Sequence, residues 1–309
     1  MSSVLRIGSR TSDLAMWQTR RVTALLQAAW PDLVCEVVPF VTKGDKTLDQ
    51  SLPAIGGKGL FTAELEESLR AGAIDLAVHS LKDLPVANAP GTVLGAISDR
   101  ADVRDTLVAR DGMTLADLPE GARVGTSSIR RQAQLLAVRP DLCVESIRGN
   151  VPTRVRKVMD GQYDATLLAA AGLVRLGMDD VISEWLALDV MLPAPGQGAL
   201  AIQCRADDGA TIDYLKPLHD AAAAAAVTAE RHFLYALGGG CSAPIAAHAT
   251  VDNTVDNGLV ELVARVGAHD GSKLIEVRGR DADPVALAQR LADDALAAGA
   301  QALLADVPA

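Results

Sequence analysis

Four arginines lie near the expected starts of two helices, in a stretch that reads GTSSIRRQ, CVESI and RGNVPTR. Arg130 and Arg131 belong to the first helix, and Arg148 and Arg154 to the second. Backbone N–H groups and the positive end of the helix dipole gather at such a start, where more positive charge is unfavourable without an anion. Guanidinium groups bind carboxylates and phosphates through paired donors. The stretch 125–154 therefore predicts an anion-binding site, and a solvated basic surface is the alternative.

A lysine and an aspartate follow the strand-like segment IDLAVHS. This segment brings Ser80, Lys82 and Asp83 to its carboxyl end. An ion pair between Lys82 and Asp83 on the surface would contribute little to stability. In a cleft among cations, Asp83 would instead stay ionised and stabilise a developing positive charge or transfer a proton. His79 alternates inward on the strand, so we expect it to be structural.

Two loops offer further groups that could bind an anion. SRTS follows the first strand-like segment, and there Arg10 would bind an anion or Ser12 would simply cap the next helix. In IGGKG, Lys58 stands among glycines that let the backbone approach a ligand. The spacing of a Walker A loop is absent, and a flexible turn is the alternative.

Cys241 differs from the other cysteines because three glycines, residues 238–240, precede it and SAP follows it. A thiol on such a bare loop is accessible, and neighbouring cations would favour its thiolate. Covalent attachment of a group is one interpretation, and a free loop thiol is the other. Cys35, Cys143 and Cys204 lie in or beside strand-like segments and are expected to be buried, small apolar side chains. No CxxC pair or His/Cys cluster indicates a metal site.

The composition bounds the possible partners. The chain has 309 residues, a formal net charge of −10 and a pI near 5.0, which argues against general binding of nucleic acid. No apolar segment reaches the length of a membrane span, and MSSVLRIGSR contains no apolar core of signal-peptide length. We therefore expect a cytoplasmic protein that binds neither nucleic acid nor membranes. Basic side chains gathered in an acidic protein indicate a pocket.

Strand-like and helical segments alternate over the first two hundred residues, which is typical of α/β architecture with mainly parallel sheets. SRTS, HSLKDLP, GTSS and RGN all follow strands, where ligands bind in such folds. LPAPGQG resembles a crossover, and ALAIQCR after it is expected to return to the first domain. The tail predicts antiparallel strands and one amphipathic helix. We expect an α/β domain of residues 1–99 with 200–218, an α/β domain of 100–199 and a small α+β domain of 219–309.

Long segments along essentially the whole chain resemble the porphobilinogen deaminase family, also called hydroxymethylbilane synthases. They are RIGSRTSDLAMWQ, VTKGDK, GGKGLFTAELE, IDLAVHSLKDLP, RVGTSSIRRQAQL, SIRGNVPTR, DATLLAAAGLVRLG, LPAPGQGAL, VTAERHFL and GGGCSAPI. Two departures concern secondary contacts. Some relatives have a lysine where this chain has Ala54, and relatives often have a glutamate where it has Gln203.

The resemblance implies two domains like type II periplasmic binding proteins, with the active site between them, and a third domain that carries a cofactor cysteine. It implies a transferase that condenses four porphobilinogen molecules head to tail into linear hydroxymethylbilane, releasing ammonia, in tetrapyrrole (haem) biosynthesis. The reaction starts on a dipyrromethane cofactor joined by a thioether to Cys241, and Asp83 is the catalytic carboxylate. The family expectation for the oligomeric state is a monomer.

The motif match also implies roles for the remaining polar residues. The residues expected to bind the cofactor are Lys82, Arg130, Arg131, Ser128, Ser80, Thr126, Ser127, Arg148 and Arg154. The residues expected to bind substrate are Arg10, Ser12, Lys58, Arg148, Arg154 and Arg175. The residue chemistry agrees, because each porphobilinogen carries an acetate and a propionate, and Asp83 is suited to the cation left when ammonia departs.

Two other functions are compatible with part of the sequence. A non-enzymatic anion-binding protein of the periplasmic-binding class would explain the arginines, but it leaves Asp83 and Cys241 without a role. An enzyme that acts on a phosphorylated metabolite would need a complete phosphate motif, and none is present.

Overall fold

The computed structural model describes all residues except 1–3, 43, 45–61, 241–242, 255–257 and 306–309. The chain divides into two compact units. Unit 1 comprises Met1–Leu48, Gly57–Ala101 and Gly198–Ala224, and unit 2 comprises Asp49–Gly56, Asp102–Gln197 and Ala225–Ala309. Lys58, Cys241 and Ala54, which the sequence singled out, lie outside the described residues.

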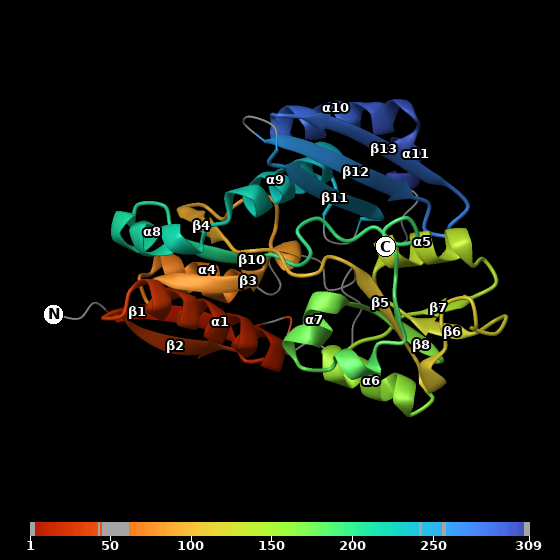
Figure 1. The fold of residues 1–309 in the computed structure, drawn as a ribbon, viewed down its shortest axis with the longest axis horizontal. Coiled ribbons are helices and arrows are strands. Elements are labelled where there is room, and N and C mark those ends of the chain that lie inside the picture. Colours follow the sequence, from red (N-terminus) through yellow and green to blue (C-terminus); the bar gives the residue numbers. More distant parts are fainter. Residues whose placement is uncertain (1–3, 43, 45–61, 241–242, 255–257, 306–309) are drawn as a thin grey trace. The chain divides into compact units, whose positions relative to one another are not determined.

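Unit 1 is built on a five-stranded sheet with the order β2-β1-β3-β10-β4. The strands are β1 (Val4–Arg10), β2 (Val34–Phe40), β3 (Leu76–Ser80), β4 (Thr92–Ile97) and β10 (Leu200–Arg205). β1 pairs in parallel with β2 and β3, whereas β10 runs antiparallel to β3 and β4. Figure 1 shows β10 lying between two strands from the first hundred residues. The helices are α1 (Asp13–Ala29), α4 (Ala63–Arg70) and α8 (Gly209–Leu215), with short 3₁₀ turns η1 (Leu81–Asp83) and η4 (Lys216–Leu218).

Unit 2 contains a second five-stranded sheet with the order β7-β6-β8-β5-β9. The strands are β5 (Asp105–Ala109), β6 (Arg123–Gly125), β7 (Cys143–Glu145), β8 (Ala165–Ala169) and β9 (Glu184–Trp185). β6 pairs in parallel with β7 and β8, and β5 runs antiparallel to β8 and β9. The helices of this part are α5 (Ile129–Val138), α6 (Val151–Met159) and α7 (Ala170–Arg175), with 3₁₀ turns η2 (Arg110–Gly112) and η3 (Asp179–Val181).

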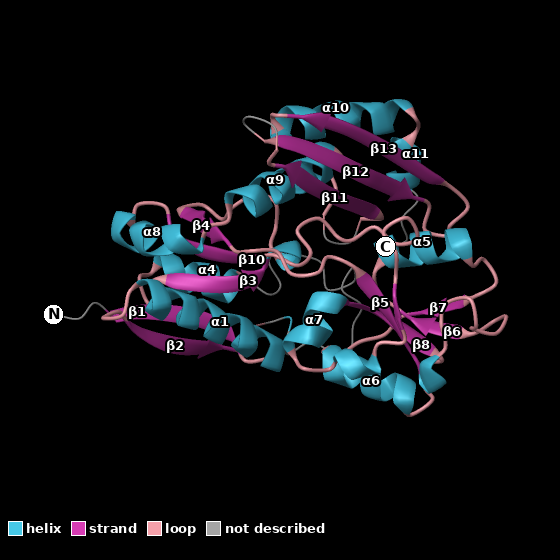
Figure 2. Cartoon of the chain, viewed as in Figure 1, coloured by secondary structure: helices cyan, strands magenta, loops and turns pink. Residues whose placement is uncertain are grey.

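The rest of unit 2 is a three-stranded antiparallel sheet with helices, as Figure 2 shows. The strands are β11 (Ile245–Asp252), β12 (Leu259–Gly267) and β13 (Leu274–Asp281). The helices are α10 (Pro284–Ala297), α11 (Ala300–Ala305) and α9 (Ala221–Ala236), whose first turn belongs to unit 1. Alternate residues of β12, such as Leu262 and Ala264, are buried, and α10 buries Leu287 and Leu291. This alternation places one face of the sheet in the core.

The expected fold class is confirmed: two α/β parts and a small α+β part. The expectation of mainly parallel sheets is confirmed: one strand of each five-stranded sheet, β10 or β5, runs antiparallel to its neighbours, and the other four strands run in the same direction. Cys204 is buried and Cys35 half-buried, but Cys143 is exposed on the edge strand β7, contrary to expectation. Within the described residues, no helix is long and apolar enough to cross a bilayer.

Candidate active site

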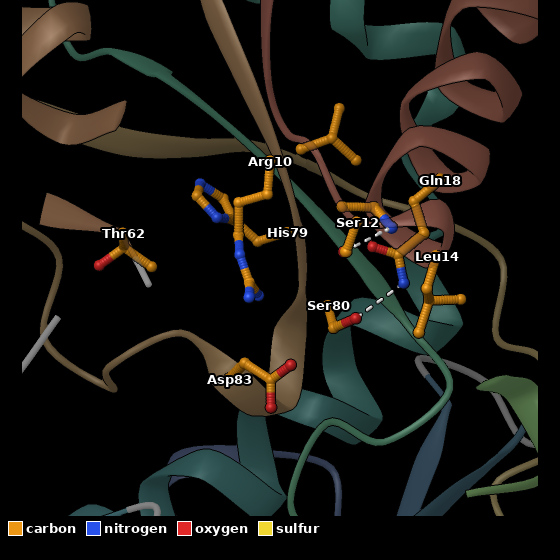
Figure 3. A pocket seen from close by; sticks show the side chains of 10 residues that line it. Arg10, Ser12, Leu14, Gln18, Thr62, His79, Ser80 and Asp83 are labelled. Atoms are coloured by element: carbon orange, nitrogen blue, oxygen red, sulfur yellow. Dashed lines mark hydrogen bonds between the residues drawn. The ribbon is translucent and has the colours of Figure 1, made fainter. Parts of the chain in front are cut away.

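A pocket in unit 1 opens where β1 and β3 end. Because these strands are parallel, their carboxyl ends meet at one edge of the sheet, where ligands bind in α/β folds. Its lining consists of Arg10, Ser12, Leu14, Ala15, Gln18, Thr62, Val78, His79, Ser80 and Asp83. Figure 3 shows Arg10 extending toward Asp83 across this space. Asp83 is exposed and Arg10 is half-buried, so a carboxylate and a guanidinium face the same solvent-accessible volume.

Local structure orients the hydroxyl groups of this pocket. Ser12 caps α1, and its Oγ accepts a hydrogen bond from the backbone N of Ala15 at 3.4 Å. Gln18 donates from Nε2 to Ser80 Oγ at 2.8 Å, a bond drawn in Figure 3. Since Ser80 accepts from Gln18, its own hydroxyl proton is available to a ligand oxygen. Lys82 follows in η1 and is half-buried.

His79 is a buried, neutral group beside this pocket. Its Nε2 lies 3.1 Å from Gln203 Oε1, and Gln203 donates from Nε2 to Thr92 Oγ1 at 2.8 Å. Thr92 in turn donates to the carbonyl of Ala89 at 2.8 Å. This chain of bonds directs the Gln203 oxygen at the imidazole, so His79 donates from Nε2. Burial lowers the pKa of His79 to about 4, and the nearby positive charge of Arg10 lowers it as well. The hydrogen bond with Gln203 has the opposite effect and raises this pKa.

A second group of charged residues lies in unit 2, at the start of α5. Ser128 caps this helix and thereby places Arg130 and Arg131 in its first turn. Both are almost fully buried, 5% and 6% exposed, and they share the wholly buried carboxylate of Asp105. Arg131 Nη2 donates to Asp105 Oδ1 at 2.8 Å, and Arg130 Nη2 lies 2.8 Å from Oδ2. The anion that the helix start requires is therefore present within the chain itself.

The charges in this cluster do not cancel. Two guanidinium groups that stay ionised in proteins face one carboxylate, which leaves one positive charge in excess. Burial lowers the pKa of Arg130, and the Asp105 carboxylate opposes that effect. The buried Nε of Arg131 meets no hydrogen-bond acceptor among the residues that the structure describes. Excess positive charge and an unused buried donor together fit a further carboxylate supplied by a bound group.

A backbone carbonyl group binds the other terminal nitrogen, Nη1, of each guanidinium. Arg130 Nη1 donates to the carbonyl of Leu192 at 2.6 Å, and Arg131 Nη1 donates to that of Leu167 at 2.7 Å. Gln197 donates from Nε2 to Asp105 Oδ1 at 2.8 Å. Sequence reasoning did not single out Asp105 or Gln197. The one sequence feature that could have indicated Asp105 is its position as a single acidic residue at the start of the apolar segment DTLVA, which forms β5.

The loop before α5 holds its hydroxyl groups in local bonds. Thr126 Oγ1 accepts from the backbone N of Ser128 at 3.1 Å. Ser127 donates to the carbonyl of Ile147 and lies 2.8 Å from Ser146 Oγ. These bonds join the loop after β6 to the loop after β7, both at carboxyl ends of parallel strands.

The remaining predicted arginines stand around α6 and α7. Arg148 is half-buried just before α6, whose N-cap Asn150 accepts from the backbone N of Thr153 at 3.0 Å. Arg154 donates from Nε to the carbonyl of Gly149 at 2.8 Å, and Arg175 is half-buried at the end of α7. The described residues thus bring part of the predicted set together in two places. The unit 1 pocket contains Arg10, Ser12, Ser80 and Asp83 and adds Gln18 and Thr62, and the cluster at the start of α5 contains Arg130 and Arg131.

No group of three or more His, Cys, Asp or Glu side chains within the described residues is arranged to hold a metal ion.

Residues 5–213 match the family described as porphobilinogen deaminase, dipyromethane cofactor binding domain, and residues 224–297 match its C-terminal domain. The chain is 52% identical over 308 residues to the porphobilinogen deaminase of Roseiflexus sp. (strain RS-1), covering 99% of this chain and 100% of the relative. It is 52% identical over 309 residues to that of Syntrophotalea carbinolica, covering 98% and 96%. A solved structure with similarity is the periplasmic aliphatic sulphonate binding protein SsuA from Escherichia coli, at 15% identity and a TM-score of 0.39 over 76% of this chain and 70% of that one. The chain belongs to the porphobilinogen deaminase family, transferases of tetrapyrrole synthesis that act on porphobilinogen and carry a dipyrromethane cofactor.

Proposed function

We propose that this chain is a hydroxymethylbilane synthase that joins four porphobilinogen molecules head to tail and releases ammonia at each addition. The observation that carries the proposal is the pocket in which the exposed Asp83 carboxylate faces Arg10 at the ends of β1 and β3. Guanidinium suits the acetate and propionate groups of the substrate. A carboxylate beside it suits the positive charge that develops when ammonia leaves.

The pocket residues have separate roles in binding the substrate and in its chemistry. Arg10, with Ser12 and Ser80, holds substrate carboxylates, and Ser80 donates because Gln18 already occupies its acceptor side. Asp83 stabilises positive charge as the carbon–nitrogen bond breaks, and it accepts the proton released when the new carbon–carbon bond forms. Dipyrromethane, when bound, supplies the terminal pyrrole carbon at which the first addition takes place. A tethered primer makes each later addition effectively intramolecular.

We assign dipyrromethane to a thioether on Cys241 and to the cationic and hydroxyl groups expected from the motifs. The excess positive charge at Asp105, Arg130 and Arg131 supports a carboxylate of the cofactor at the start of α5. The cofactor set is Cys241, Lys82, Ser80, Thr126, Ser127, Ser128, Arg130, Arg131, Arg148 and Arg154. The substrate set is Arg10, Ser12, Lys58, Arg148, Arg154 and Arg175.

The wider organisation is also part of the proposal. We divide the chain into three domains, 1–99 with 200–218, 100–199 and 219–309, of which the last carries Cys241. We expect a cytoplasmic monomer that binds neither nucleic acid nor membranes, in keeping with a net charge of −10.

Intact mass spectrometry tests the covalent primer. Wild-type protein purified from cells should be heavier than its sequence by two linked pyrrole units, and Cys241→Ser should have the bare sequence mass. Cys143→Ser is the matched control, because Cys143 is the exposed thiol of the described chain and should have no part in attachment. Active wild-type protein at bare mass, or an unchanged increment in Cys241→Ser, would contradict the proposal.

A further inference from the structure

Asp105 is a wholly buried carboxylate to which the reaction assigns no role. It begins β5, and its Oδ1 accepts hydrogen bonds at 2.8 Å from Nη2 of Arg131 and from Nε2 of Gln197. Its Oδ2 forms an ion pair at 2.8 Å with Nη2 of Arg130. A buried carboxylate is unfavourable unless it is paired and hydrogen-bonded, so this environment is specific to an ionised aspartate. Its partners include two residues that we assign to the cofactor.

Asp105 determines where both guanidinium groups lie. Each of them is held at two points, by Asp105 and by a carbonyl group, of Leu192 for Arg130 and of Leu167 for Arg131. Without the carboxylate, two cations would stand side by side at the positive end of a helix, where they repel each other and the dipole. The pair can keep its buried geometry only because Asp105 bridges it.

Asp105 also determines the charge that the cluster presents. With the carboxylate ionised, two positive charges meet one negative charge, and the buried Nε of Arg131 remains unused among the described residues. Gln197 adds a neutral donor, so it orients Asp105 Oδ1 without changing this balance. One further carboxylate would neutralise the cluster.

We propose that Asp105 is a positioning residue that holds Arg130 and Arg131 in place and limits this cluster to a single carboxylate of dipyrromethane. The inference rests on the proposed function, because it takes the two arginines as cofactor ligands. Asp105 does not touch the cofactor in this scheme. It acts through the arginines, and its removal should therefore affect how much cofactor the protein holds.

The test compares Asp105→Asn with Asp75→Asn by intact mass and thermal unfolding. Asp75 is a matched control in unit 1, where it pairs with Arg6 and Arg205 and has no assigned ligand. Both variants should unfold at lower temperature than wild type. Only Asp105→Asn should also lose the dipyrromethane mass increment, with at least a tenfold lower loaded fraction, and Asp105→Glu, which keeps the charge, should recover part of it.

The variant Arg131→Gln distinguishes an error in the positioning role of Asp105 from an error in the assignment of the arginines to the cofactor. If Arg131→Gln loses the mass increment while Asp105→Asn keeps it in full, the arginine assignment stands and the positioning role is overturned. If Arg131→Gln also keeps it, the cofactor assignment itself is wrong. Should Asp105→Asn fail to fold, Gln197→Leu removes the amide that donates to Asp105 Oδ1 and to the carbonyls of Val103 and Arg104, and leaves the carboxylate in place. A loaded fraction equal to wild type in that variant would overturn the proposal.

Discussion

The buried imidazole of His79 makes stability depend on pH. Its pKa is about 4 in the folded protein, compared with about 6.5 in an unfolded chain. Between these two pKa values the unfolded state binds more protons than the folded state. The contribution of the neutral His79 to stability is therefore fully present above about pH 6.5 and is lost as the pH falls toward 4. The free energy of unfolding should fall by about 3 kcal/mol over this window.

Urea unfolding at pH 7 and pH 4.5 measures this effect. Gln203→Glu should reduce the difference, because a carboxylate beside the imidazole favours its protonated form. His79→Gln should remove this contribution altogether. A pH dependence in His79→Gln equal to that of wild type would show that other groups cause it.

Asp83 is the residue on which turnover should depend most. Asp83→Asn keeps the shape of the side chain but removes the negative charge, so the rate should fall by a factor on the order of 10² to 10⁴. The mass increment of the cofactor should remain, since the substitution would not alter the proposed thioether and arginine contacts. Asp32→Asn, at an exposed aspartate outside the pocket, should keep wild-type turnover. Wild-type turnover in Asp83→Asn would remove this carboxylate from the mechanism.

The residues of the unit 1 pocket could be predicted because strand ends are visible in the sequence. Arg10, Ser80 and Asp83 each follow a strand-like segment, and parallel strands bring such ends together. Asp105 could not be predicted as the partner of Arg130 and Arg131. Their meeting depends on β5 pairing with β8, which no local pattern encodes.

At the scale of elements, the turn between β12 and β13 packs closely on α5. Gly271 in this turn has φ +75°, and a Cβ there would lie 2.5 Å from the backbone N of Ala137 in α5. Gly271→Ala should lower the free energy of unfolding by about 3 kcal/mol, from the left-handed backbone and the clash together. Urea unfolding measures this loss.

Gly72 offers the matched control for this substitution. It has φ +68°, but a Cβ there would have no neighbour within 4 Å. Gly72→Ala should therefore cost only the backbone contribution, about 1 kcal/mol. Equal losses in the two variants would mean that the contact with α5 does not contribute.

Helix starts are visible locally in the sequence, which indicates Ser12 as a cap, whereas the caps Ser128 and Asn150 emerge from the structure. Ser12, Ser128 and Asn150 each accept a backbone hydrogen bond at the start of a helix. The strands β5 and β9 were not predicted. β9 has only two residues and β5 is buried along its whole length, so neither shows an alternation of apolar and polar residues.

At the scale of the whole molecule, an acidic composition is compatible with the cationic cluster at the start of α5, because the two arginines of this cluster are buried. Arg130 and Arg131 are almost fully buried, whereas the surplus of acidic residues over the chain gives a net charge of −10. An acidic protein repels polyanions at long range but still binds a small carboxylate where guanidinium groups are fixed inside. The overall charge could be derived from the sequence, but which cations are internal could not.

The position of β10 also bears on the order in which the protein is made. A ribosome releases β1 to β4 first, but the place between β3 and β4 is filled only by Leu200–Arg205. Until those residues emerge, β3 and β4 each expose an edge without its partner, and Leu200, Ile202 and Cys204 are missing from the first core. The second sheet is synthesised in the interval. The part of the chain that is translated first is therefore completed late, and its nascent form must be protected from aggregation while the ribosome adds the intervening hundred or so residues.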